Sequence, residues 1–98
     1  MIDLTEQTFN EYINSQERVL VDFWATWCEP CRAMAPILED LNKETITVAK
    51  VDVDSQINIA KAQGIRSMPT LVLYENGVEV NRLVGARPKN IVVEELGL

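Results

Sequence analysis

The chain has 98 residues, of which 47% are hydrophobic and 24% are charged, and its formal net charge at pH 7 is −6. This size and composition are those of an ordinary globular domain, so we expect one domain over residues 1–98. The acidic balance and the lack of a basic cluster argue against nucleic-acid binding, because such a surface must neutralise several phosphates.

The first residues of the chain lack the basic region and the apolar run of a secretory signal peptide. No apolar stretch approaches the ~20 residues that cross a bilayer. We therefore expect a cytoplasmic monomer in a reducing setting, without a membrane or nucleic-acid partner. The two cysteines lie three positions apart, so a bridge between them closes too short a loop to serve as a structural staple.

The first part of the chain predicts a strand, a helix and a second strand. Residues 2–4 form a candidate edge strand. Thr8 and Glu11 have the spacing of a capping box, in which two side chains cap the first turn of a helix, here one of about two turns. Residues 19–24 are almost continuously apolar, which is typical of a central strand covered on both faces.

A long helix is expected from Cys28, because the apolar residues that follow recur every three or four positions. Pro36 lies well inside this helix, where it removes a backbone hydrogen bond and should cause a kink. A β-branched strand follows at residues 47–53. Asp54-Ser55 can cap a third helix, which Gly64 should end.

The last third of the chain predicts a hairpin and a helix. Asn76-Gly77 separates two β-branched stretches, and this dipeptide is the strongest short hairpin signal. Gly85 should end the second strand, and Pro88 suits the first turn of a helix over residues 89–96. The order β-α-β-α-β-α-β-β-α implies a mixed sheet with helices on both faces.

Cys28 and Cys31 form a Cys-x-x-Cys motif where a buried strand gives way to a helix. If Cys28 is the N-cap, Cys31 lies one turn later on the same face, close enough to form a disulfide. The free N–H groups and the dipole of the first turn then favour the Cys28 thiolate. Because the thiolate is the attacking species in thiol–disulfide exchange, we expect a reversible redox pair.

A zinc site is the alternative interpretation of the two cysteines. A closed structural zinc site needs four ligands, usually Cys or His. The chain has no His and no third Cys, so only a site shared between two chains could supply four thiolates. We therefore expect no metal and no bound cofactor.

The segment Trp24-Ala25-Thr26-Trp27-Cys28-Glu29-Pro30-Cys31 resembles the active-site segment of the thioredoxin family, whose usual form is Trp-Cys-Gly-Pro-Cys. The likeness covers essentially the whole chain and continues, in the family's order, at Asp22, Pro36, Lys50, Met68-Pro69-Thr70 and Gly85. It implies the thioredoxin fold, an α/β fold with a central mixed five-stranded sheet and four helices. It also implies reduction of disulfides in substrate proteins, with electrons from NADPH through thioredoxin reductase.

The resemblance implies distinct roles for the residues around the dithiol. Cys28 attacks a substrate disulfide to form a mixed disulfide, and Cys31, deeper in the fold, resolves it. Loss of the Cys31 proton in an apolar setting requires a base. Asp22 lies in an apolar strand, so its pKa should be raised toward the working range, and Lys50 on the next strand could face it. The alternatives are an Asp22 at an exposed strand end or in a turn, and a Lys50 at the rim.

The resemblance also implies a substrate-binding surface. We assign to it Trp27, Glu29, Pro30, Met68, Pro69, Gly85 and Ala86. Trp27 should be exposed beside the nucleophile. The bond before Pro69 is cis in the family, which leaves the Met68 backbone free to pair with an extended substrate segment. The alternatives are a core tryptophan, an ordinary trans proline at a strand start and a glycine in a simple turn.

Glu29 departs from the family pattern, which has Gly at this position. A carboxylate in the first turn suits the helix dipole. It also disfavours a second negative charge nearby, so we expect a higher pKa for the Cys28 thiol than with Gly. Arg32, one turn later, should partly offset this effect. The preferred substrates and the redox poise depend on this loop and stay open.

Three rival functions are compatible with the motif. A glutathione-linked dithiol protein is the nearest, but the Trp-Cys-x-Pro-Cys segment and Asp22 favour a thioredoxin. A binding module would dock a partner on the surface around Trp27, Met68 and Pro69 without turnover. An oxidant or isomerase of an oxidising compartment is disfavoured by the lack of a signal peptide.

Overall fold

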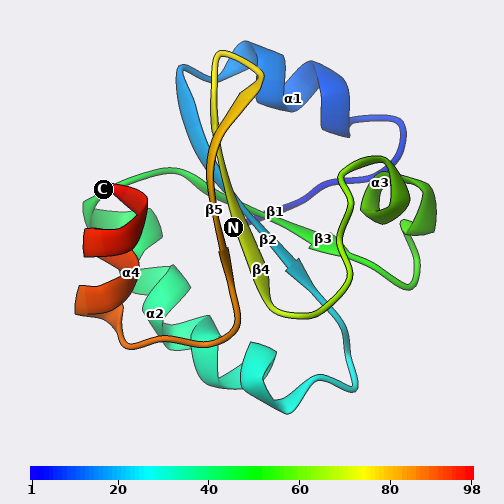
Figure 1. Cartoon of the computed structure of the whole chain (residues 1–98). Coiled ribbons are helices and arrows are strands. Elements are labelled where there is room, and N and C mark those ends of the chain that lie inside the picture. Colours follow the sequence, from blue (N-terminus) through cyan, green and yellow to red (C-terminus); the bar gives the residue numbers. More distant parts are fainter.

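The computed structural model describes all 98 residues and contains a five-stranded sheet flanked by four helices (Figure 1). The strands are β1 (Ile2–Asp3), β2 (Arg18–Trp24), β3 (Val48–Asp52), β4 (Thr70–Glu75) and β5 (Val78–Val84). The helices are α1 (Phe9–Ser15), α2 (Glu29–Glu44), α3 (Ile57–Ala62) and α4 (Lys89–Leu96). The element order and the mixed α/β architecture are those predicted from the sequence.

β2 is the central strand of the sheet, whose order is β1-β3-β2-β4-β5. It pairs in parallel with β3 and antiparallel with β4. β1 lies parallel to β3 at one edge, and β5 lies antiparallel to β4 at the other. Because both faces of β2 are covered, its apolar run is nearly continuous.

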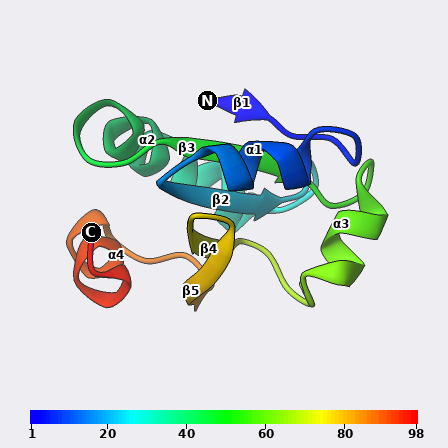
Figure 2. The same ribbon diagram turned by 90° about the horizontal axis from the view of Figure 1, so that it is seen from above.

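The two faces of the sheet carry separate apolar clusters. Alternate residues of β2 point to opposite faces, so Val19, Val21 and Phe23 pack with α1 and α3, whereas Leu20 packs with α2 and α4. Figure 2 shows α2 and α4 together on one side of the sheet and α3 on the other. Asp22 has the same parity as Leu20 and therefore faces α2.

α2 contributes to both clusters. Its interior residues Met34, Leu38 and Leu41 belong to the cluster shared with α4. The cysteines at its N-terminal end belong instead to the cluster shared with α1 and α3. The helix runs without interruption through Pro36, and the kink expected there stays a prediction. No helix combines the length and the apolar composition needed to cross a bilayer.

The hairpin forms as the Asn-Gly signal predicts. Asn76 and Gly77 have φ angles of 51° and 83° and connect Glu75 to Val78, which pair across the ladder. Two successive residues with positive φ define the turn whose twist matches that of the flanking strands.

The predicted capping of α1 is wrong in detail. Thr8 is the N-cap residue, but its side chain makes no capping hydrogen bond to the helix. A turn already precedes α1, since the N–H groups of Thr8 and Phe9 both donate to the Thr5 carbonyl. The Thr8 hydroxyl accepts the Thr5 N–H at 2.9 Å within this turn. It therefore does not bond to the first turn of α1, and no capping box with Glu11 forms.

The predicted caps of the later helices also differ. Gln56, rather than Asp54-Ser55, is the N-cap residue of α3, and it makes no side-chain cap. The Asp52 carboxylate accepts the N–H groups of Asp54 and Ser55 at 3.0 and 3.4 Å, which closes a turn directly at the end of β3. Pro88 is the N-cap residue of α4 rather than a residue of its first turn.

Candidate active site

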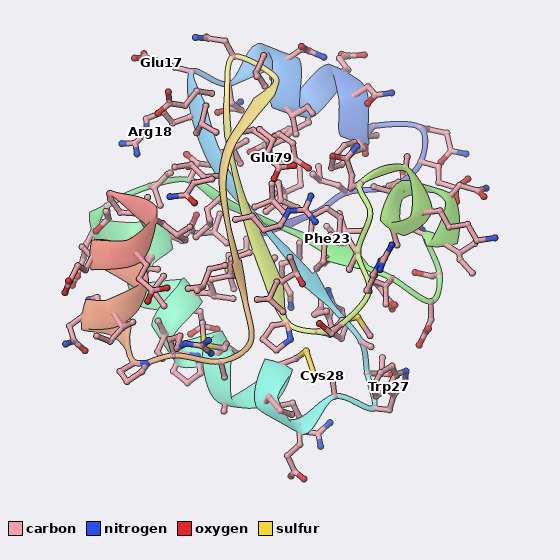
Figure 3. The ribbon with its side chains drawn as sticks, in the orientation of Figure 1. Glu17, Arg18, Phe23, Trp27, Cys28 and Glu79 are labelled. Carbon is pink, nitrogen blue, oxygen red and sulfur yellow. A yellow bond between two sulfur atoms is a disulfide. The ribbon has the colours of Figure 1, made fainter.

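Cys28 and Cys31 are joined by a disulfide at the start of α2, with their Cα atoms 5.3 Å apart (Figure 3). Cys28 is the N-cap residue of α2, and its Sγ accepts the Cys31 N–H at 3.2 Å. Both the predicted position and the predicted bond are confirmed. When the bond is reduced, this N–H and the helix dipole favour a negative charge on Cys28.

The two cysteines differ in their hydrogen bonding and in their surroundings. Cys28 is 3% exposed and Cys31 is 5% exposed, so both are buried, and only Cys31 lines the cavity that holds Asp22. The expectation of a deeper Cys31 stays a prediction. The disulfide holds both residues in the same apolar cluster, against which Met68 and Trp24 also pack. No group of three or more His, Cys, Asp or Glu side chains is placed to hold a metal ion.

Asp22 is a buried carboxyl in the middle of the sheet. It is 3% exposed and is paired in register with Lys50 on β3 and Leu71 on β4. Its Oδ1 atom is buried and has no hydrogen-bond partner. Burial raises the pKa of Asp22 to about 7, against the opposing effect of the Lys50 charge. The alternative of an exposed strand end is therefore wrong.

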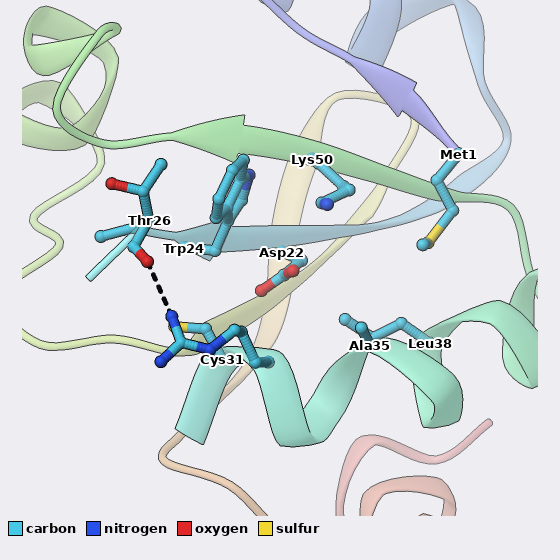
Figure 4. Close-up of a pocket in the computed structure, with 10 residues that line it drawn as sticks. Met1, Asp22, Trp24, Thr26, Cys31, Ala35, Leu38 and Lys50 are labelled. Carbon is cyan, nitrogen blue, oxygen red and sulfur yellow. Dashed lines mark hydrogen bonds between the residues drawn. The ribbon is translucent and has the colours of Figure 1, made fainter. Parts of the chain in front are cut away.

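A cavity of about 290 Å³ connects Asp22 with Cys31 (Figure 4). Its walls come from β2 and the loop after it, from β3, from the first three turns of α2 and from the N-terminus. They are formed by Met1, Asp22, Trp24, Ala25, Thr26, Cys31, Arg32, Ala35, Leu38 and Lys50. Among these only Asp22 and Cys31 combine burial with acid–base or thiol chemistry. A proton could therefore pass between Cys31 and the Asp22 carboxyl through this cavity.

Lys50 borders the same cavity but does not form an ion pair with Asp22. Its Nζ atom lies 4.4 Å from the centroid of the Trp24 ring, a cation–π arrangement. The Lys50 charge is therefore close enough to act on the pKa of Asp22, while its nearest identified partner is the indole. Trp24 itself is half-buried, in keeping with a mainly packing role.

Trp27 is exposed beside the disulfide, as predicted, with 65% of its surface accessible (Figure 3). Its Nε1 donates to Oδ2 of Asp54 at 2.8 Å. Asp54 is thus a residue of the site that we expected only as a helix cap. The link joins the loop before α2 to the loop after β3 and fixes an apolar ring in an exposed position.

Glu29 and Arg32 lie on the solvent side of the cysteines. Arg32 Nη2 is 3.6 Å from Oε1 of Glu29, and the two side chains are 59% and 89% exposed, respectively. Arg32 Nη1 also donates to the Thr26 carbonyl at 2.8 Å (Figure 4). The proximity that we expected between Glu29 and Arg32 is present. Arg32 additionally ties the first turn of α2 to the loop before it.

The segment before β4 forms a second part of the predicted substrate surface. The Met68–Pro69 bond is cis, as the resemblance implies. Pro69 is buried and Met68 is half-buried. The Pro69 carbonyl accepts the N–H of Gly85 at 2.8 Å, and Gly85 has a φ of 95°, which favours glycine. Ala86 and Pro30 are exposed.

The predicted site residues thus fall into two groups. Cys31, Asp22 and Lys50 surround the cavity, whereas the seven residues assigned to substrate binding all lie outside it. Cys28 is at the junction, bonded to Cys31 and followed directly by Glu29. The arrangement can perform dithiol chemistry on the outer side and proton transfer on the inner side.

Comparisons with known proteins agree with this geometry. The family model "Thioredoxin" matches residues 1–97. The thioredoxin of Mycolicibacterium smegmatis is 43% identical, over 97% of this chain and 90% of its own length. A bifunctional thioredoxin reductase/thioredoxin of Mycobacterium leprae is 41% identical, over 97% of this chain and 22% of its own length. The structure of mitochondrial thioredoxin 3 from Saccharomyces cerevisiae, in its oxidized form, has a TM-score of 0.89 and 33% identity, over all of this chain and 95% of that one.

Proposed function

Because the chain belongs to the thioredoxin family and is therefore a thiol-disulfide oxidoreductase, we propose that it serves as a general reductase of disulfides in other proteins. The observation that carries this proposal is the Cys28–Cys31 disulfide at the N-terminus of α2, next to a cavity that holds a buried Asp22. A thiol pair with a nearby proton acceptor can be oxidised by one disulfide and reduced again by another donor.

Cys28 is the proposed nucleophile. In the reduced protein its thiolate attacks one sulfur of a substrate disulfide, so that a Cys28–substrate bond forms and the substrate bond breaks. The first substrate thiolate leaves and takes up a proton. This assignment follows from the N–H that Cys28 Sγ accepts and from its place at the helix N-cap, both of which favour the thiolate.

Cys31 is the proposed resolving thiol, and Asp22 is its proton acceptor. The Cys31 thiolate attacks Sγ of Cys28, the Cys28–Cys31 bond forms, and the second substrate thiol is released. Two electrons have then passed from the dithiol to the substrate. Asp22 is suited to the proton transfer because its pKa of about 7 lets it accept and return a proton near neutral pH. Lys50 acts through Asp22, since its charge lowers the pKa of that carboxyl.

The exposed side of the cysteines is the proposed substrate surface. It comprises the exposed residues Trp27, Glu29, Pro30 and Ala86, together with the half-buried Met68 and Gly85 and the buried Pro69. The Trp27 ring offers apolar contact, and an extended substrate segment would pair with the Met68 backbone as an added strand. Glu29 places a carboxylate beside the nucleophile, so it is the residue most suited to discriminate among charged substrates.

The same proposal extends to the partners and the location of the protein. The electrons would come from NADPH through a thioredoxin reductase, which is supported by the Mycobacterium leprae relative whose name joins both activities in one chain. We further propose that the protein acts in electron transport as a monomeric, single-domain protein of the cytoplasm, without nucleic-acid or membrane partners.

Reduction of insulin disulfides by dithiothreitol, with and without the protein, tests this function. We expect the wild-type protein to accelerate the reaction and the Cys28→Ser variant to have no effect. An unchanged rate with wild-type protein would refute the proposal. The rivals are separated by two further measurements. Turnover supported by glutathione but not by thioredoxin reductase would indicate a glutathione-linked protein, and partner binding that survives Cys28→Ser with Cys31→Ser would indicate a docking module.

A further inference from the structure

Arg82 on β5 ties the end of α3 to the hairpin, away from the cavity of Asp22 and Cys31. Its Nη2 donates to the Gln63 carbonyl at 2.7 Å, and its Nη1 donates to the Gly64 carbonyl at 3.4 Å. The hydroxyl of buried Tyr74 donates to the Gln63 side-chain oxygen at 2.7 Å. The C-terminal end of α3 is therefore held by a cation and a buried phenol in addition to its apolar contacts.

Glu79 orients the Arg82 side chain. Its two carboxylate oxygens accept the Nε and Nη2 protons of Arg82 at 2.9 and 2.8 Å, a bidentate pair of fixed geometry. The side chains of Arg82 and Glu79 are 28% and 37% exposed. Glu79 lies beside β5 on the side toward α3 (Figure 3). The guanidinium is thus held in one orientation while its remaining protons reach α3.

A β-bulge makes this pairing possible. Tyr74 pairs with Glu79, whereas the preceding residue Leu73 pairs with Asn81, so Val80 is an extra residue in β5. Residues three apart in a regular strand point to opposite faces. The inserted residue brings Glu79 and Arg82 to the same face. The bulge therefore serves the contact with α3.

The residues that Arg82 holds begin the connection to the proposed substrate segment. Only three residues separate Gly64 from Met68. At its far end the connection is fixed by two hydrogen bonds, from the Thr70 hydroxyl to the Ser67 carbonyl at 2.6 Å and from the Gly85 N–H to the Pro69 carbonyl at 2.8 Å. Because the connection is so short, a displacement of Gly64 should also displace Met68.

We propose that Arg82, oriented by Glu79, is a positioning residue for substrate binding. It fixes the C-terminal end of α3, and the short connection that follows this end places the Met68–Pro69 segment where the substrate binds. This inference rests on the proposed function, which assigns that segment to the substrate. Arg82 takes no part in the thiol chemistry. Its loss should therefore weaken the binding of protein substrates and leave the reactivity of Cys28 intact.

Arg18 provides a matched control within the same chain. Its Nε is 3.2 Å from Oε2 of Glu75, and its Nη2 donates to the Gly97 carbonyl at 3.3 Å. Arg18 thus pairs with a glutamate and holds the C-terminal end of a helix, as Arg82 does. That helix is α4, which does not lead to the Met68–Pro69 segment. A general effect of losing such an arginine would appear equally at both positions.

The test measures kcat and KM for insulin, with dithiothreitol as reductant, in wild type, Arg82→Ala, Arg82→Lys and Arg18→Ala. We expect Arg82→Ala to raise KM about fivefold with kcat unchanged, the size of effect given by the net loss of one typical hydrogen bond. Arg82→Lys should lie between it and wild type, because lysine keeps the charge without the planar fork. Arg18→Ala should match wild type.

A small substrate separates positioning from a general loss of structure. The reduced proteins are mixed with hydroxyethyl disulfide, which is too small to use an extended binding surface, and the reaction is followed by tryptophan fluorescence. We expect equal rate constants for all variants. Hydrogen exchange at the Gly85 amide, which donates to the Pro69 carbonyl at 2.8 Å, should be faster in Arg82→Ala than in Arg18→Ala.

Three results would overturn the inference while the proposed function stands: an unchanged KM for insulin in Arg82→Ala, an equal loss with hydroxyethyl disulfide, or an equal rise of KM in Arg18→Ala. If Arg82→Ala does not fold, Arg82→Lys and Glu79→Gln provide the same comparison and should raise KM by smaller factors. If wild-type protein fails to reduce insulin at all, the proposed function fails first and the inference fails with it.

Discussion

Asp22 and Lys50 face each other in register across two parallel strands, yet the Lys50 ammonium lies over the Trp24 ring and forms no ion pair with the carboxylate. The Oδ1 atom of Asp22 is left buried without a hydrogen-bond partner. An ion pair would have lowered the pKa of Asp22 and favoured its charged form near neutral pH. Without one, desolvation prevails and the pKa of Asp22 is about 7.

The stability of the oxidised protein should fall as pH rises from about 4 to about 7. In that range the unfolded chain releases the Asp22 proton at its ordinary pKa of 3.8, while the folded protein retains it up to about 7. The raised pKa of Asp22 thus adds to the free energy of unfolding. This contribution is fully present below the unfolded-state pKa of 3.8 and is lost as the pH rises to the folded-state pKa of about 7. The gap corresponds to roughly 4 kcal/mol at most.

Urea unfolding at pH 5 and pH 8 measures this contribution. The Asp22→Asn variant removes the titration while keeping the shape of the side chain, so its free energy of unfolding should be higher than that of wild type at pH 8. The rise should be about 2–4 kcal/mol. An identical pH dependence in wild type and Asp22→Asn would show that Asp22 is charged in the folded protein over the whole range.

The Asp22→Asn variant should also slow disulfide reduction. Asparagine cannot accept the Cys31 proton, and loss of a general base costs about a hundredfold in rate. The mixed disulfide between Cys28 and substrate should then accumulate, which gel electrophoresis after acid quenching detects. The wild-type pH–rate profile should have a break near 7 that the variant lacks. A variant that slows the first attack without accumulating the intermediate would contradict this role of Asp22.

Lys50→Met should raise the pKa of Asp22 further. The Lys50 charge is the identified influence that lowers this pKa, and methionine fills similar space over the Trp24 ring without a charge. The break in the pH–rate profile should therefore move to higher pH. Lys43→Met, at the exposed last turn of α2, is the control and should leave the profile in place. A downward shift with Lys50→Met would be incompatible with the geometry.

Glu29→Gly should lower the pKa of the Cys28 thiol, because it removes a negative charge next to the forming thiolate. The effect should be small, since the Glu29 side chain is 89% exposed and lies near Arg32, and solvent and salt screen such charges. Titration of the thiolate by its ultraviolet absorbance measures the change. Arg32→Ala should shift the Cys28 pKa in the opposite direction, and added salt should shrink both differences. An unchanged or higher pKa in Glu29→Gly would contradict the expectation.

Features fixed by short-range rules could be read from the sequence. The N-cap position of Cys28, the Asn76-Gly77 hairpin and the burial of Asp22 each follow from a few neighbouring residues and their conformational preferences. The cis bond before Pro69 could not be inferred in this way and was expected only from the resemblance. An isolated proline at a strand start carries no local signal for a cis bond.

Side-chain contacts between distant segments could not be predicted. Asp54 looked like a helix cap because its local partners favour that role, but Asp52 closes the turn and leaves Asp54 free to accept the Trp27 indole. The orientation of Lys50 over Trp24 and the contact of Arg82 with α3 depend on how whole elements pack. Such contacts are decided by tertiary structure, which overrides local preference.

The two apolar clusters on opposite faces of the sheet share one helix, because α2 supplies the cysteines to one and Met34, Leu38 and Leu41 to the other. Neither apolar cluster can therefore unfold while the other stays intact, because the loss of either one would remove part of the packing that holds α2 in place. Heating or denaturant should consequently take the molecule apart in one cooperative step, with far-ultraviolet circular dichroism and tryptophan emission changing together.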